Sequence, residues 1–362
     1  MAGLDTSVCR LLGTRYPIVQ APMAGGPSTP ALAAAVSEAG GFGFVAAGYL
    51  DPAALGTQIE AVRALTDRPF GINVFAPPAT PAPRGAVEAY AELIAPIAAA
   101  AGVALGTPRF DDDHFDAKLA VVLDSRPAAV SFTFGSPDPG TIRELRARGI
   151  EVWITITSRD EARTAALAGA DALVVQGAEA GGHQGSFADT DDEPLPLLDL
   201  LRTVAEVMPE VPHRSSRCRL IATGGLQTGA QIAAALAAGA DAVQLGTAFM
   251  LCPEAATSEV HRRALATPAP TTLTRAFTGR RARGIVNAWT DLVGGAAPSA
   301  YPEIHHLTAA LRAHGRRAGD PDLINMWAGA DHHLARALPA AQIVAELADE
   351  IAAARRDHSP RG

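Results

Sequence analysis

AGADALVVQG at residues 168–177 is repeated almost letter for letter by AGADAVQLGT at residues 238–247. In each stretch an alanine-rich helical segment ends at a glycine suited to a left-handed C-cap, and a short, nearly all-apolar strand follows. SEAGGFGFV at 37–45 is a looser copy of the same junction. A strand that is apolar on both faces belongs to a parallel sheet covered by helices. The recurrence therefore predicts repeated strand–helix units.

The chain contains about eight strands of this kind. They are 17–21, 42–46, 70–74, 130–134, 152–157, 172–176, 219–222 and 242–246. Helical patterns separate most of them, which predicts an α/β protein with a (β/α)8 TIM barrel. Several strands end in glycine or small polar residues, and in such a barrel those ends carry the chemistry. A doubly wound open sheet shows the same alternation, but its GxGxxG pattern after the first strand is missing.

Two segments interrupt the alternation. Residues 76–113 begin with a proline-rich stretch and continue as an alanine-rich helix, and residues 253–322 contain TTLTRAFTGRRARGIVN at 271–287. We expect these segments to form a smaller lid domain over the C-terminal face of a barrel made from 8–75 and 114–252. Residues 337–356 are amphipathic, so we expect 323–362 to return to the barrel as a helical segment.

Composition excludes several classes of protein. The 362 residues carry a net charge of −8, with 48% hydrophobic residues, which is unlike a disordered chain. Without a basic stripe, we expect no nucleic-acid partner. The three cysteines form no disulfide or zinc pattern. The longest apolar run, 93–105, is too short to span a bilayer, and the first residues lack a secretion signal, so we expect a cytoplasmic protein without membrane contact.

Glycines follow the seventh and eighth predicted strands. Gly224 and Gly225 end one strand, and Gly246 precedes Thr247 at the end of the other. In barrels these two loops commonly bind phosphate through backbone N–H groups, and a Cβ there would block the approach of the backbone. Ordinary turn glycines are the alternative. The pairing predicts a site for a phosphorylated cofactor.

The segment QGAEAGGHQG at 176–185 follows the sixth strand and contains His183. Two glycines before it would let the loop press against a flat ligand, and imidazole is suited to proton transfer or anion binding. A structural or merely exposed histidine is the alternative. Asn73 ends the third strand, where its amide could donate to and accept from a heterocycle.

Other polar residues in the sequence give weaker evidence of a functional site. Adjacent histidines on a helix point apart, so His305-His306 and His332-His333 are expected on the solvated surface, and no metal site is predicted. The acidic run 111–113 is expected at a helix N-terminus. Lys118, the only lysine, is expected to be a surface or helix residue. Serine-hydrolase GxSxG and P-loop patterns are absent from the sequence.

Four motifs resemble those of the nitronate monooxygenase family, formerly called 2-nitropropane dioxygenases, and especially its bacterial class I branch. They are VQAPMAGGPSTP at 19–30, GFGFVAAGY at 41–49, ALVVQGAEAGGHQG at 172–185 and ATGGLQTG at 222–229. The resemblance extends over about 11–312, and GAEAGGH is its most specific block. It implies an FMN-dependent TIM-barrel oxidoreductase that converts alkyl nitronates, such as propionate 3-nitronate, and O2 into a carbonyl compound and nitrite. It also implies a role in detoxification.

The resemblance also implies site residues. The flavin contacts would be Met23, Asn73, Gln176, Gly181, Gly225, Gln244, Leu245, Gly246 and Thr247. His183 would be the catalytic residue, and Tyr301 in YPEIHHLT would line the substrate pocket with it. The chain departs from some relatives at Thr133, where they carry a second histidine. The partners would be a nitronate and O2, with the protein acting as a monomer or homodimer.

Three alternative functions remain open from the sequence. A flavin-dependent enoyl-acyl carrier protein reductase shares the barrel and a Gly-Gly-His loop, but NADH would bleach its flavin. A flavin-binding protein without turnover would release no nitrite from any nitronate. A phosphate-binding barrel without flavin would be colourless.

Overall fold

Eight parallel strands form the barrel in a computed structural model that describes residues 4–208 and 218–357. The strands are β1 (Ile18–Gln20), β2 (Gly43–Ala46), β3 (Phe70–Phe75), β4 (Ala129–Thr133), β5 (Glu151–Ile156), β6 (Ala172–Gln176), β8 (Arg219–Thr223) and β9 (Ala242–Leu245). Their order is β1-β9-β8-β6-β5-β4-β3-β2. A parallel bridge between Val19 and Phe42 joins the two ends of this order. The predicted barrel is therefore confirmed, with strand ends displaced by at most one residue.

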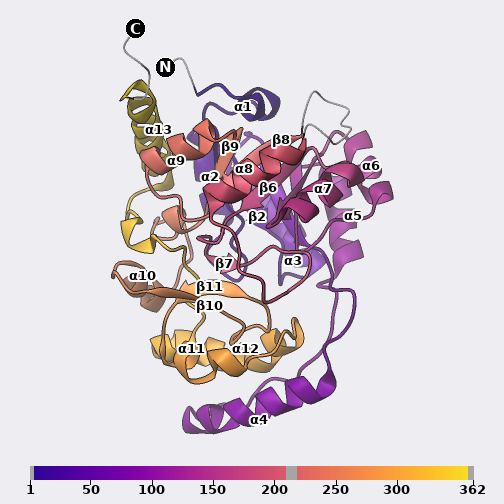
Figure 1. Cartoon of the computed structure of the whole chain (residues 1–362), viewed down its shortest axis with the longest axis vertical. Helices are drawn as coiled ribbons and strands as arrows, with labels where there is room; N and C mark the ends of the chain where they lie inside the picture. Colours follow the sequence, from indigo (N-terminus) through magenta and orange to yellow (C-terminus); the bar gives the residue numbers. More distant parts are fainter. Residues whose placement is uncertain (1–3, 209–217, 358–362) are drawn as a thin grey trace.

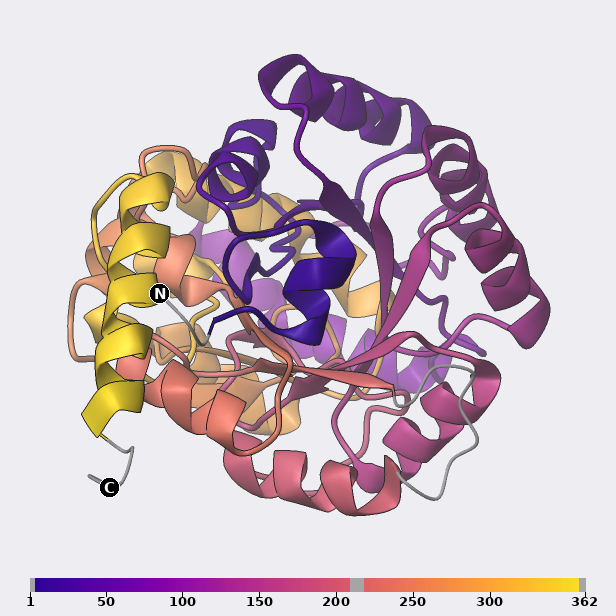
Figure 2. The same cartoon turned by 90° about the horizontal axis from the view of Figure 1, so that it is seen from above.

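Helices surround the strands, as Figure 2 shows from above. The helices of this layer are α2 (Pro30–Glu38), α3 (Pro52–Leu65), α5 (Phe115–Ser125), α6 (Pro139–Ala147), α7 (Arg159–Ala168), α8 (Leu197–Val207) and α9 (Gly229–Ala237). Three of them begin with proline after a polar cap whose side chain accepts a backbone N–H, at Thr29, Asp51 and Asp138. Val and Ile from the strands pack against the apolar helix faces and form the largest core cluster. The outer layer fixes the strand ends that line the site.

The N-terminal end of the barrel is closed by α1 (Ser7–Leu12), whose Val8 and Leu12 pack in a cluster with Phe42, Phe44 and Trp153. The chain ends in α13 (Ala340–Asp357), close to the predicted 337–356, and this helix lies against α9 and α2. Within the described ranges, none of the helices has the length and apolar character needed to cross a bilayer.

A second body lies against the C-terminal end of the barrel, below it in Figure 1. Its helices are α4 (Arg84–Ala100), α10 (Glu259–Leu265), α11 (Ala288–Val293) and α12 (Glu303–Ala318), with short 3₁₀ turns at Gly294–Ala296 and Pro321–Leu323. Two more 3₁₀ turns lie at Thr247–Phe249, directly after β9, and at His332–Leu334. Tyr90 and Ile94 of α4 share an apolar cluster with Phe277, Trp289 and Leu311. The two interrupting segments thus pack on each other, although their division into domains stays a prediction.

A small antiparallel sheet connects the two bodies, and the sequence did not predict it. β10 (Thr271–Thr274) pairs with β11 (Ala282–Ile285), which pairs in turn with β7 (Gly182–His183). The Gly-Gly-His loop after β6 is therefore an edge of this sheet. This pairing brings residues 271–285 next to the strand ends of the barrel.

Candidate active site

A cavity of about 430 Å³ lies at the C-terminal ends of the barrel strands, lined by residues of both bodies. Ten of the predicted site residues line it: Met23, Asn73, Gln176, Gly181, His183, Gly225, Gln244, Leu245, Gly246 and Thr247. Tyr301 does not border the cavity; its ring packs beside that of His183, with 5.8 Å between centroids.

The barrel wall of the cavity, which we call the floor, consists of Gly224, Gly225, Gln227, Gln244, Gly246 and Thr247. Within the described chain, the backbone N–H groups of Gly225 and Gly246 have no hydrogen-bond acceptor. A Cβ at Gly246 would meet Ala21 and Met23 only at ordinary contact distances of 3.6–3.9 Å. Gly246 therefore leaves open space next to free N–H donors, as phosphate binding requires.

Gly225 is a glycine for a different reason. Its φ is +66°, and a Cβ would lie 2.7 Å from the Cβ of Glu179. The carboxylate of Glu179 accepts the backbone N–H of Leu197 at 3.0 Å, which holds that side chain in place. The backbone and Glu179 thus exclude a side chain at 225, whether or not a phosphate binds there.

The floor also presents unpaired polar atoms. The side-chain Oε1 atoms of Gln244 and Gln227 are buried without a hydrogen-bond partner among the described residues, and both side chains line the cavity. A buried acceptor without a donor costs free energy, so a ligand N–H that meets it is favoured. An isoalloxazine ring offers such an N–H, and the Gly246 wall has room for a phosphate. The residues present therefore fit a phosphorylated flavin.

Two predicted contacts, Asn73 and Gln176, are occupied by the protein itself. Asn73 donates from Nδ2 to the hydroxyls of Ser131 at 2.9 Å and Thr133 at 3.0 Å. Gln176 donates to the carbonyl of His183 at 3.0 Å and accepts from the N–H of Gly185 at 2.7 Å. Gln176 therefore clamps the histidine loop from below while it borders the cavity.

The two glycines before His183 serve the protein's own packing. A Cβ at Gly181 would lie 2.4 Å from the backbone of Ala328, and Gly182 has a φ of +76°. The chain at 328–329 fills the space that a Gly181 side chain would need, so this glycine has a packing reason of its own; its contact with a flat ligand stays a prediction.

His183 belongs to the opposite wall, which we call the roof and which comprises Gly182, His183, Thr278, His305, Arg312 and Trp327. The Nε2 atom of His183 lies 2.8 Å from the hydroxyl of Thr278. Burial, with the positive charges of Arg280 and Arg312, lowers the pKa of His183 from 6.5 to about 3. The imidazole is therefore neutral at pH 7.

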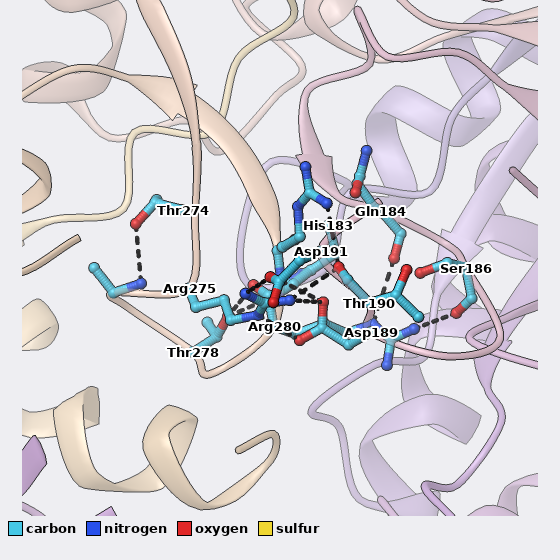
Figure 3. Close-up of polar contacts among 12 residues, drawn as sticks. His183, Gln184, Ser186, Asp189, Thr190, Asp191, Thr274, Arg275, Thr278 and Arg280 are labelled. Carbon is cyan, nitrogen blue, oxygen red and sulfur yellow. Dashed lines mark hydrogen bonds and ion pairs between the residues drawn. The ribbon is translucent and has the colours of Figure 1, made fainter. Parts of the chain in front are cut away.

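Arginines of the 271–287 segment fasten the loop that follows His183 (Figure 3). Arg275 forms ion pairs with Asp189 at 2.8 Å and Asp191 at 2.6 Å. Arg280 donates to the carbonyls of Gln184 and Ser186, and its guanidinium lies 4.1 Å from the ring centroid of Phe134. The arginine-rich stretch thus orders the active-site loop.

One face of α12 supplies the positive part of the roof. His305, Ala309, Arg312 and Arg316 line the cavity at the i, i+4, i+7 and i+11 positions of the helix. Arg312 donates to the carbonyl of His305 at 2.8 Å and to the hydroxyl of Thr308 at 3.1 Å. No carboxylate among the described residues pairs with it, and burial lowers its pKa to about 10. An uncompensated cation therefore borders the cavity.

The expectation that the paired histidines lie on the solvated surface is wrong for three of the four: His305 and His306 are half-buried, and His332 is buried. His305 stacks on Tyr49 with 4.1 Å between ring centroids, and His306 lies 2.7 Å from Asp111. His332 is fully buried between two backbone carbonyls, whereas His333 is exposed. Lys118 is a helix residue, as expected, but it is fully buried on α5 and pairs with Asp113 at 2.6 Å. Tertiary packing covers these polar groups because each one finds a partner.

The model of the nitronate monooxygenase family matches residues 7–350 of the chain. The chain belongs to the nitronate monooxygenase family. A nitronate monooxygenase from Paraburkholderia phytofirmans is 42% identical over 354 residues, covering 94% of this chain and 93% of the relative. One from Pseudomonas aeruginosa is 40% identical over 352 residues, covering 94% and 98%. The motifs predicted this family correctly.

A solved structure supports the fold. A nitroalkane oxidase from Streptomyces ansochromogenes superposes with a TM-score of 0.92 at 48% identity, covering 97% of this chain and 99% of the other. Membership in the nitronate monooxygenase family makes the protein an oxidoreductase and implies a flavin cofactor. The roles of individual site residues stay predictions.

Proposed function

We propose that the protein binds FMN in this cavity and uses O2 to oxidise alkyl nitronates, such as propionate 3-nitronate, to a carbonyl compound and nitrite. The observation that carries the proposal is the pairing of two unlike walls around one cavity. The floor offers free N–H groups and unpaired amide oxygens, and the roof offers uncompensated positive charge. FMN rather than FAD is favoured because a single glycine-lined phosphate site occurs without a Rossmann motif.

The floor would hold the cofactor. The N–H groups of Gly225 and Gly246 would donate to its phosphate, and the Oε1 of Gln244 would accept a ring N–H. Bound flavin supplies the redox chemistry, accepting electrons from the nitronate and delivering them to O2. The chain's own work is then orientation and electrostatics.

The roof would hold the substrate. A nitronate is an anion, and the guanidiniums of Arg280 and Arg312 make this side of the cavity positive. Burial raises the pKa of Tyr49 to about 12, so its phenol stays neutral beside His305 and adds no repelling charge. His183 is neutral as well, so one ring nitrogen donates a hydrogen bond and the other accepts one.

The decisive experiment combines the absorbance spectrum of the protein with a measurement of nitrite release. Purified protein should show flavin absorbance, and the cofactor released by heat should run as FMN on chromatography. Anaerobic propionate 3-nitronate should bleach the flavin, and O2 should then restore it with release of nitrite. Bleaching of the flavin by NADH instead would favour the enoyl reductase alternative. Bound flavin without nitrite release would favour a flavin-binding protein without turnover. A colourless protein that takes up no FMN would exclude the proposed function and favour a phosphate-binding barrel without flavin.

The name of the solved Streptomyces relative suggests neutral nitroalkanes as a second substrate form. We also infer a cytoplasmic location and a monomer or homodimer, as the family resemblance implies. Sedimentation analysis of the flavin-loaded protein measures the assembly state.

A further inference from the structure

Thr278 lies in the turn between β10 and β11, next to His183. We propose that Thr278 is a positioning residue that holds His183 in its Nε2–H tautomer and so leaves the Nδ1 lone pair facing the cavity. The catalytic consequence rests on the proposed function, whereas the tautomer itself does not.

The hydrogen bonds of the Thr278 hydroxyl indicate which ring nitrogen of His183 carries the hydrogen. Thr278 is only 1% exposed, so its hydroxyl must find its partners within the protein. The backbone carbonyl of Arg280, 3.3 Å from the hydroxyl oxygen, can only accept a hydrogen bond. The other contact of the hydroxyl is the Nε2 of His183 at 2.8 Å. The one arrangement that satisfies both contacts has the hydroxyl donating to the carbonyl and accepting from Nε2, which then carries the hydrogen.

The other ring nitrogen of His183, Nδ1, is open to the cavity. Nδ1 of His183 has no hydrogen-bond partner among the described residues, and it is not one of the buried unpaired atoms. Since His183 lines the cavity, Nδ1 is open to it. A neutral imidazole has one N–H, so a hydrogen on Nε2 makes Nδ1 an acceptor.

The ring is held in this orientation from several sides. Pairing of β7 with β11 and the amide of Gln176 fix the backbone of His183. The rings of Phe134, Tyr301 and Trp327 surround the imidazole with centroid distances of 5.6–5.8 Å. A ring flip that exchanged the two nitrogens would have to displace these aromatic neighbours and break the bond to Thr278.

An acceptor at Nδ1 can take a proton from a neutral nitroalkane, because the nitronate formed beside it offsets the cost that burial and the two arginines place on a charged His183. The C–H bond next to the nitro group breaks, its electron pair moves into the nitro group to form the nitronate, and the proton goes to Nδ1. Nε2–H continues to donate to Thr278 throughout. An added nitronate lacks this proton and needs no such step, so Thr278 should matter for the neutral substrate far more than for the anion.

The test uses Thr278→Val, which keeps the shape and removes the hydroxyl, and Thr278→Ser, which keeps the hydroxyl. Long-range ¹H–¹⁵N spectra of the flavin-loaded protein report the tautomer, with His183→Asn identifying the His183 signals. The parent and Thr278→Ser should show Nε2–H, and Thr278→Val should show a mixture or Nδ1–H. Flavin content and melting temperature confirm that each variant is folded.

Turnover gives the second readout. Thr278→Val should lose about tenfold or more in kcat/KM on a neutral nitroalkane and change nitronate turnover by less than about threefold, with Thr278→Ser close to the parent. Nδ1–H in the parent, or an unchanged tautomer in Thr278→Val, would overturn the proposal. A protein that shows Nε2–H but releases no nitrite from any substrate would contradict the proposed function alone.

Discussion

The floor and the roof of the cavity are built in different ways. The floor comes from the ends of neighbouring strands β8 and β9, and its main feature is the lack of side chains at Gly225 and Gly246. The roof is made of residues from β7, the β10–β11 turn, α12 and the segment at 327. A floor made of backbone suits an invariable cofactor. A roof made of side chains from distant segments suits substrate chemistry, because each group can change without disturbing the barrel.

The largest expected effect is in the roof. His183→Asn keeps an amide that can donate to Thr278 but removes the base. We expect activity on neutral nitroalkanes to fall by about 10²–10⁴-fold, the typical contribution of general base catalysis. Most nitronate turnover should remain. Nitrite release is measured for both substrate forms at matched flavin content; equal losses on both would show that His183 has no base-specific role, and no loss on either would leave it structural.

Arg312→Met tests the positive charge of the roof. Loss of one hydrogen bond to a charged group costs about 1.5–3 kcal/mol, so KM for propionate 3-nitronate should rise by roughly 10–150-fold with a smaller change in kcat. FMN affinity should stay within about twofold. Arg317→Met is the matched control, since Arg317 is exposed on the same helix and does not line the cavity. An unchanged KM would place the substrate away from Arg312.

Gly246→Ala tests the floor without straining the protein. The added Cβ would make ordinary contacts with Ala21 and Met23, so any loss of FMN must come from the cofactor's own approach. Overpacking costs about 1–3 kcal/mol, which raises the FMN dissociation constant by roughly 5–150-fold. Gly56→Ala in α3, where a Cβ meets nothing within 4 Å, is the control. Fluorescence titration of the apoprotein that gives equal affinities would mean that phosphate lies elsewhere.

The smallest expected effect concerns His261 and the stability of the folded protein in acid. Burial lowers the pKa of His261 from 6.5 to about 4, and its Nε2 lies 3.0 Å from the carbonyl of Trp327. The unfolded chain therefore takes up this proton first as pH falls. The stability contributed by the neutral ring is complete above pH 6.5 and is lost as pH falls toward 4.

His261→Gln should reduce that loss by no more than about 3 kcal/mol, because glutamine can donate to the same carbonyl without titrating. Melting temperatures at pH 7 and pH 4.5 measure the difference between the variant and the parent. An equal decrease in both proteins would assign the acid sensitivity to other groups.

The sequence predicted where the floor residues lie, because their signals are local, whereas their contacts with a cofactor stay a prediction. A run of apolar residues identifies each strand. The glycine at position 246 depends only on the surroundings of one strand end. Even so, the reason for a glycine was not always predictable: Gly181 is excluded from carrying a side chain by Ala328, far away along the chain.

The roof was less predictable because its groups meet only in the folded protein. His305 and Arg312 are one helical face, a spacing of seven residues that could have been noticed, but nothing local indicates that this face covers a cavity. Thr278 in a polar stretch has no distinguishing neighbour. The burial of Lys118 depends on Asp113, which the sequence placed only in an acidic run.

A crystal structure of the FMN-loaded protein tests the division of labour between floor and roof most directly. We predict the phosphate within hydrogen-bond distance of the Gly246 N–H, the ring edge at the Oε1 of Gln244, and an open substrate space between the ring and Nδ1 of His183. A phosphate bound away from the ends of β8 and β9, or a flavin ring that separates His183 from the open space, would contradict this account.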